Sequence, residues 1–306
     1  MRALEPHAAF VISSGLRISR PSVEVNLGTS CNLRCELCDH GVPRVRKSPL
    51  LLGELSRDLQ AAAAVIAAAE LRLVGGEPLL HPQLHELIQA ARRSGIAEKI
   101  VLMTNGVLAK IIKPESLEGL DVVVVTVYPS TRSAVDVDLL RGLARRCGFA
   151  LELRYTPSFR HTLLDTINRD SALVQKIYRT CGLAHVFACH TIHNGRYYKC
   201  SPAPFLQDRL DAGGEALRDG VALHDNQSLR QELVDYLACP HPLNACRYCL
   251  GTAGKTKRHR QLASVAAPRQ DLTPTEKLLA TSLDRLVDRL VVRWRRAIEW
   301  RWSRHA

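Results

Sequence analysis

The chain has 306 residues, 46% of them hydrophobic, and can bury a full core in one large domain or two ordinary ones. It shows no secretory signal and no apolar run of about 18 residues, so we expect neither secretion nor a membrane span. Ten cysteines without an export signal favour metal or redox chemistry in a reducing cytoplasm. The net charge is +12, and residues 253–306 carry 13 − 5 = +8 of it, but no nucleic-acid-binding motif accompanies that basic tail, so we expect no nucleic-acid partner.

The first predicted strand, residues 22–27, runs into a loop with three cysteines, Cys31, Cys35 and Cys38, in the pattern C-x3-C-x2-C. Thiolates this close suit an iron–sulfur cluster, which normally takes four cysteine ligands, so three leave one iron with an open position. A zinc ion is the alternative, but zinc sites usually complete their tetrahedron with a second pair of ligands, and no fourth thiol lies nearby. The loop therefore predicts a cluster that can bind a further ligand.

Helices and strands then alternate at intervals of roughly 25–30 residues, as in parallel βαβ units. We predict helices at residues 55–70, 81–94 and 133–146 and strands at residues 71–74, 99–103, 121–128 and 150–155. The expected fold class is α/β, a partial or complete β/α barrel with its chemistry at the carboxyl ends of the strands. Two motifs, Gly75-Gly76-Glu77-Pro78 and Thr104-Asn105-Gly106, lie at such ends.

Strand alternation predicts the interior of this barrel, because neighbouring side chains of a strand point to opposite faces. If the apolar faces meet the outer helices, the interior is polar and carries Glu24, Asn26, Thr126, Tyr128, Glu152 and Arg154. These side chains either bind a polar substrate or only hydrogen-bond one another.

Six further cysteines appear once the β/α rhythm fades: Cys181, Cys189, Cys200, Cys239, Cys246 and Cys249. Residues 186–200 predict a β-hairpin with Asn194-Gly195 as a two-residue type I′ turn. In that register Cys189 lies opposite Cys200, with Cβ atoms ~5 Å apart. A second metal site is therefore expected, with structural zinc as the alternative to an iron–sulfur cluster.

The tail begins with a capping box, Thr273-Pro274-Thr275-Glu276, which predicts a helix to about residue 302. Its apolar stripe fits packing against the barrel or a second subunit. Contact with a membrane surface through the arginines and tryptophans is the alternative.

The motifs together resemble the signature of the radical S-adenosylmethionine (radical SAM) superfamily. By that resemblance Cys31, Cys35 and Cys38 hold a four-iron four-sulfur cluster whose fourth iron chelates S-adenosylmethionine. One electron, from a donor such as flavodoxin or ferredoxin, then releases a 5′-deoxyadenosyl radical that takes a hydrogen atom from the substrate. The resemblance also implies residues that contact the cofactor: Leu37 at the adenine, Gly75, Gly76, Glu77 and Pro78 at the amino group, and Thr104 and Asn105 near the methionine or ribose.

The later cysteines resemble the twitch and SPASM extensions of that superfamily, which hold auxiliary four-iron clusters. We expect one such cluster, because no cysteine follows Cys249 to complete a second. The twitch pattern would use Cys181, Cys200, Cys246 and Cys249, whereas the hairpin geometry would use Cys181, Cys189, Cys200 and Cys246. We predict the second set, which leaves Cys249 as a free thiol.

Within the superfamily the chain resembles aminoglycoside-tailoring enzymes of the neomycin epimerase type. This implies epimerisation of an amino sugar, with Cys249 returning a hydrogen atom from the face opposite the adenosyl group. Dehydrogenation or dehydration of such a sugar, and peptide modification, remain open. The implied organisation is an N-terminal extension (1–20), a partial (β/α)6-type radical SAM barrel (21–175), an auxiliary-cluster extension (176–262) and a basic amphipathic helix (270–306).

Overall fold

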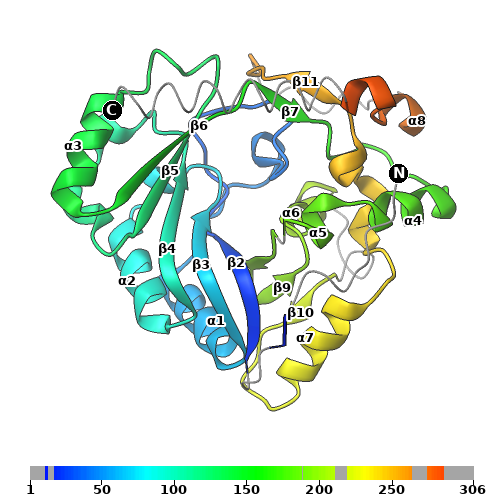
Figure 1. The fold of residues 1–306 in the computed structure, drawn as a ribbon, viewed down its shortest axis with the longest axis horizontal. Coiled ribbons are helices and arrows are strands. Elements are labelled where there is room, and N and C mark those ends of the chain that lie inside the picture. The colour runs from blue at the N-terminus through cyan, green and yellow to red at the C-terminus, as the bar shows by residue number, and fades with distance from the viewer. Residues whose placement is uncertain (1–10, 13–16, 188, 211–218, 264–273, 286–306) are drawn as a thin grey trace.

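One large, mostly parallel sheet organises the computed structural model, which describes residues 11–12, 17–187, 189–210, 219–263 and 274–285 (Figure 1). Its strands are β1 (Val11–Ile12), β2 (Ile18–Asn26), β3 (Ile66–Val74), β4 (Ala97–Thr104), β5 (Val122–Val127), β6 (Ala150–Tyr155), β8 (Thr191–His193), β9 (Arg196–Tyr198) and β10 (Val221–Ala222). They lie in the order β10-β9-β8-β2-β3-β4-β5-β6, with β1 beside β2. The strands from β8 through β2 to β6 are parallel, and the predicted α/β class is confirmed.

Three helices cover the outer face of the parallel strands: α1 (Leu52–Val65), α2 (Leu84–Ser94) and α3 (Val137–Cys147) (Figure 1). Shorter helices follow in the C-terminal part: α4 (Ser171–Arg179), α5 (Gly182–His185), α6 (Pro202–Leu210), α7 (Leu229–Ala238) and α8 (Thr275–Leu278). A separate two-stranded sheet joins β7 (Ser158–Arg160) to β11 (Thr256–Arg258).

The two faces of β2 differ in chemistry as its alternation predicts. Val23, Val25 and Leu27 are at most 1% exposed and belong to the hydrophobic core. On the other face Glu24 and Asn26 are also buried, and Glu24 lines a cavity at the carboxyl end of the sheet. The polar interior predicted for this strand is therefore present.

Within the described residues the sheet does not close into a barrel, because β6 and β10 are its edges. At the β6 edge Arg154 Nη2 donates to Glu152 Oε2 at 2.9 Å, and the Glu152 side chain is 51% exposed. Arg154 pairs in register with Thr126 of the cleft, so both side chains lie on the predicted interior face, but that face is open to solvent here and neither of them lines the cleft.

The boundary between α1 and β3 also differs from the prediction. The alanine-rich stretch 55–70 suggested one helix, but α1 ends at Val65 and Ile66 already pairs with Ile18 of β2. Ile66 is 1% exposed. Parallel pairing and burial thus override the helical propensity of the alanines that follow it.

The predicted hairpin is present, with Asn194 and Gly195 at φ values of 47° and 71° as a type I′ turn requires. It does not form a separate unit, because β8 pairs in parallel with β2 and extends the main sheet. The turn is also tied to α1, where Gly195 N donates to Asp58 Oδ2 at 2.9 Å. The sheet thus continues across the domain boundary predicted near residue 176.

The helix predicted from residue 275 onward is interrupted within the described residues. Helix α8 ends at Leu278, and the extended Leu279 forms a β-bridge with Gly254. Ala280 N then donates to Ala253 O at 2.8 Å, so strand-like pairing replaces the next helical turn. Most of the predicted apolar stripe lies outside the described residues. Among those described, no helix has the length and apolar character needed to cross a bilayer.

Candidate functional site

The three cysteines of the predicted cluster loop line one cavity of about 250 Å³ at the carboxyl end of the sheet, called here the cleft. The loop follows β2, and Cys35 is the most buried of the three at 8% exposed. The ends of β3, β4 and β5 contribute much of the remaining wall, and Phe159, Leu183, Cys189 and Ser201 complete it. Among the residues that line it are Glu24, Asp39, His40, Gly75, Gly76, Thr104, Asn105, Thr126, Tyr128 and Cys189.

Burial raises the pKa of all three cysteine thiols, and that of Cys35 reaches about 12. For Cys35 the neighbouring Cys31 adds to the effect, because two thiolates repel each other. Thiolates at such positions need a positive charge among them, which the irons of a cluster supply. The donor set and the shared cavity fit a four-iron cluster with one open position.

The two glycines of Gly75-Gly76-Glu77-Pro78 are needed because the backbone approaches the cysteine loop closely. Gly76 N donates to Gly28 O at 2.9 Å, and Glu77 N donates to Ser30 O at 2.8 Å. A Cβ on Gly76 would lie 2.2 Å from Ser30 O, which no side chain can do without displacing the loop. Gly75 has φ +151°, where side chains are strained.

Glu77 does not line the cleft with the two glycines. Its carboxylate is buried and ties the loop to the next strand end: Oε1 accepts from Thr104 Oγ1 at 2.6 Å and Leu79 N at 3.0 Å, and Oε2 accepts from Asn105 N at 2.8 Å. Burial raises the pKa of this carboxyl, and the three hydrogen bonds oppose that shift. Glu77 therefore acts as a brace that positions Gly76 and Asn105.

Asn105 carries this brace to the cysteine loop, since its Nδ2 donates to Asn32 Oδ1 at 2.8 Å. Sequence reasoning missed Asn32, because nothing in the loop pattern marks the residue after Cys31 as a partner of the β4 end.

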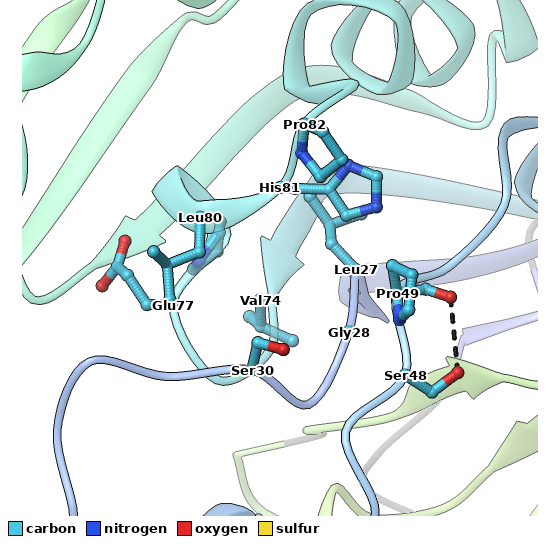
Figure 2. Close-up of a pocket in the computed structure, with 11 residues that line it drawn as sticks. Leu27, Gly28, Ser30, Ser48, Pro49, Val74, Glu77, Leu80, His81 and Pro82 are labelled. Atoms are coloured by element: carbon cyan, nitrogen blue, oxygen red, sulfur yellow. Dashed lines mark hydrogen bonds between the residues drawn. The ribbon is translucent and has the colours of Figure 1, made fainter.

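A second, smaller cavity of about 190 Å³ lies behind the same motif (Figure 2). Pro49, Glu77, Pro78 and His81 are among the residues that line it. The Glu77 carboxylate points away from Pro49 (Figure 2). The cleft wall formed by described residues includes Leu33 but not Leu37 or Pro78. The cofactor contacts predicted for Leu37 and Pro78 remain predictions.

The C-terminal cysteines separate into two groups. Cys181, Cys200, Cys246 and Cys249 line one narrow cavity of about 20 Å³. Cys189 instead lines the cleft with Cys31, Cys35 and Cys38. The hairpin ladder ends at the pair Thr191 and Tyr198, so it does not extend to the cross-strand pair expected of Cys189 and Cys200. This arrangement favours the twitch set of ligands over the hairpin set that the sequence suggested.

The remaining cysteines lie elsewhere. Cys147 is on α3, where its Sγ donates to Pro114 O at 3.4 Å. Cys239 follows α7, and its carbonyl accepts from the buried Lys199 Nζ at 2.9 Å. Within the described part of the chain, no three Cys, His, Asp or Glu side chains converge as the ligands of one metal ion. In a four-iron cluster each cysteine binds a different iron, so its ligands stand further apart.

Comparison with known proteins relates part of the chain to a known superfamily. Residues 25–139 match the model of the radical SAM superfamily, a span that includes the cysteine loop and both strand-end motifs. The chain therefore contains a radical SAM domain, and this family implies S-adenosylmethionine and a four-iron four-sulfur cluster.

Among curated relatives, the GTP 3′,8-cyclase of Streptomyces coelicolor is 31% identical over 49% of this chain and 47% of its own. Molybdenum cofactor biosynthesis protein 1 of Bos taurus is 28% identical over 50% of this chain and 25% of its own. The chain thus spans less than half the length of either relative. Among solved structures, BtrN in complex with AdoMet and 2-DOIA is 14% identical over 76% of this chain and 94% of its own, with a TM-score of 0.44.

Replacing Cys31, Cys35 and Cys38 together by alanine should remove one of two clusters. The reconstituted wild-type protein should hold about eight iron atoms, four in each cluster, so we expect about half of that iron in the variant and no cleavage of S-adenosylmethionine. Iron analysis and detection of 5′-deoxyadenosine with dithionite measure both. Cys147→Ala is the control and should change neither, whereas full iron in the triple variant would refute the site.

Glu77→Gln should weaken binding of S-adenosylmethionine while leaving the iron content near that of the wild type. Glutamine has one accepting oxygen where glutamate has two, so either Leu79 N or Asn105 N loses its acceptor, and one buried donor without a partner costs about 1–3 kcal/mol. Anaerobic calorimetry measures the affinity. The exposed Glu98→Gln is a matched control, and equal affinity in the two variants would count against the brace.

Proposed function

We propose that the protein epimerises one carbon of an amino sugar, such as an aminoglycoside, and that Cys189 returns the hydrogen atom. The observation that carries this proposal is the position of Cys189 in the cleft beside the three predicted cluster ligands. In this proposal the second cluster is held by Cys181, Cys200, Cys246 and Cys249, which share the other cavity. The roles that the sequence suggested for Cys189 and Cys249 are thereby exchanged.

The cofactors supply a 5′-deoxyadenosyl radical that abstracts hydrogen from the substrate carbon. The chain contributes the cradle: Cys31, Cys35 and Cys38 would bind the cluster, and the backbone of Gly75 and Gly76 would face S-adenosylmethionine. An enzyme of this kind must hold the cluster and S-adenosylmethionine close to the substrate carbon.

Inversion needs a hydrogen donor on the second face of the planar carbon radical, and an S–H group can supply it. When Cys189 gives its hydrogen atom, a new C–H bond forms and a sulfur radical remains. That sulfur then needs one electron and one proton, and the electron comes from the external reductant, a flavodoxin- or ferredoxin-type protein. A dehydrogenase has no such requirement, because its carbon radical gives one electron to an acceptor and one proton to a base.

Glu24 supports a substrate that carries an amino group. Its carboxylate is 9% exposed, lines the cleft and accepts from Thr191 Oγ1 at 3.2 Å. Burial raises the pKa of this carboxyl, and the nearby His40 and Arg72 oppose that shift without removing it, so a further cationic partner would stabilise its charged form. An ammonium group of the substrate would be that partner.

The curated relatives include a GTP cyclase, but their likeness covers about half of this chain, so it supports the cofactor chemistry rather than a nucleotide substrate. Anaerobic incubation with candidate aminoglycosides in deuterated water, read by mass spectrometry, separates the reactions. Epimerisation adds one deuterium with the heavy-atom formula unchanged. Loss of two hydrogens would indicate a dehydrogenase, and loss of water a dehydratase. No reaction with any amino sugar would refute this substrate class.

Cys189→Ala should keep both clusters and consume S-adenosylmethionine but yield no inverted product. Cys249→Ala should instead lose about four of the eight irons, since each cluster holds four. Iron analysis and chromatography of the sugar distinguish the two variants. Iron loss in Cys189→Ala, with full iron and no inversion in Cys249→Ala, would restore the assignment that the sequence suggested.

Glu24→Gln should raise the KM for the amino sugar about tenfold or more, because a hydrogen bond to a charged group is worth about 1.5–3 kcal/mol. The affinity for S-adenosylmethionine should stay the same. Glu152→Gln, at the exposed edge of the sheet, is the matched control. A KM that is equal in both variants would exclude Glu24 from substrate binding.

A further inference from the structure

A segment near the end of the described chain covers the cysteine loop. Strand β11 pairs with β7, and the residues after it form an antiparallel bridge between Gln261 and Cys35. Glu36 N donates to Arg260 O at 3.0 Å, and Leu262 N donates to Arg34 O at 2.8 Å. The backbone of this segment is thus fixed against the predicted ligand Cys35.

His259 of this segment points inward and reaches the sulfur of Cys35. Its Nε2 lies 3.2 Å from Cys35 Sγ, within the range of hydrogen bonds to sulfur. The ring is 5% exposed, stacks on Tyr128 with a centroid separation of 4.5 Å and meets Phe159 edge to face at 5.0 Å. Its orientation is therefore held by packing on both sides.

The hydrogen bonds that lead to the His259 ring form a chain in which each bond fixes the donor of the next. The chain begins at the backbone N–H of Arg34. Arg34 N donates to Gln261 Oε1 at 2.7 Å, so the amide of Gln261 must present its nitrogen to the other partner. That nitrogen donates to Ser130 Oγ at 3.3 Å. The hydroxyl proton of Ser130 is then available for His259 Nδ1, which lies 3.4 Å away.

The direction of the hydrogen bond between His259 Nε2 and Cys35 Sγ follows from the chemistry of a cysteine that binds iron. A thiolate bound to iron has no proton, so an unprotonated Nε2 would face it lone pair to lone pair. A neutral ring therefore carries its proton on Nε2, with Nδ1 accepting from Ser130. A doubly protonated ring also donates from Nε2. The direction of this bond is the same in both charge states.

We infer that His259 is a positioning residue of the primary cluster, donating from Nε2 to the Cys35 thiolate and raising the reduction potential of that cluster. This inference rests on the proposed role of Cys35 as a ligand. Hydrogen bonds to the sulfurs of a cluster are among the factors that set its potential, because they stabilise the more negative, reduced form. The hydrogen bonds from Gln261 to Ser130 and from Ser130 to His259 Nδ1 keep the proton on Nε2, directed at Cys35.

The test measures the midpoint potential of the primary cluster. Reduction of this cluster is monitored through its electron paramagnetic resonance signal, which is the signal that changes when S-adenosylmethionine is added. His259→Phe keeps a ring between Tyr128 and Phe159 but has no donor, so its potential should be lower than that of the wild type. His259→Gln can place an amide N–H near the same point and should recover most of the difference. Ser130→Ala should give a smaller shift in the same direction.

Two controls separate this effect from a general loss of structure. His224→Phe makes the same exchange at a histidine that pairs with Glu232 on α7, and it should leave the potential unchanged. The second cluster should keep its potential in every variant. In deuterated buffer, an exchangeable proton coupled to the primary cluster should be seen by electron–nuclear double resonance in the wild type and be absent in His259→Phe.

Equal potentials and equal proton couplings in wild type and His259→Phe would overturn the inference while leaving the proposed function intact. Failure of the wild-type protein to assemble a cluster that responds to S-adenosylmethionine would overturn the proposed function itself. If His259→Phe loses iron, the Ser130→Ala shift and the wild-type proton coupling still decide the matter. Absence of both would then refute the hydrogen bond.

Discussion

The close approach of the β3 end to the cysteine loop is the constraint on which the site depends. Two backbone hydrogen bonds, from Gly76 to Gly28 and from Glu77 to Ser30, hold the loops after two neighbouring strands together. Only glycine fits at residue 76, since a Cβ would meet Ser30 O at 2.2 Å. The buried Glu77 carboxylate then extends the same arrangement to the end of β4. Three consecutive strand ends therefore act as one rigid support.

Pairing of β8 with β2 is the second constraint on the site, because it determines which cavity each cysteine of the hairpin segment lines. Glu24 N donates to His190 O at 2.7 Å, which anchors the chain next to Cys189 on the cleft side of the sheet. Beyond the turn, Cys200 starts the segment that leads into α6 and lines the other cavity. One hairpin thus delivers one thiol to each site, which no count of cysteines along the sequence reveals.

Local patterns made most of the fold predictable. Alternation in β2 and the Asn194-Gly195 turn each express a rule that acts over a few residues, and both appear in the structure. The errors concern contacts distant in sequence. Residues 66–70 became strand because β2 offered a partner, and the helix predicted from residue 275 stops because Leu279 pairs with Gly254.

At the site, too, the sequence predicts short motifs but not contacts between residues that are distant in the chain. The cysteine loop and the two glycines are short motifs, so they were recognisable. The contact between His259 and Cys35 joins residues 224 positions apart, and a lone histidine in a basic segment carries no signal for it. The roles proposed for Cys189 and Cys249 depend on a ladder that ends two pairs before the expected pair of Cys189 and Cys200. Periodicity cannot indicate where a ladder ends.

Charge presents a conflict for the proposed amino-sugar substrate, since a protein of net charge +12 should repel a polyamine at long range. At about 0.15 M ionic strength the Debye length is about 8 Å, so charges on distant surface residues are largely screened. A carboxylate at about 4 Å from an ammonium contributes about 4 kcal/mol at an effective dielectric constant of about 20. Glu24 and Asp39 both line the cleft. These carboxylates would attract the proposed amino sugar at short range, and the net charge would affect its rate of encounter more than its affinity.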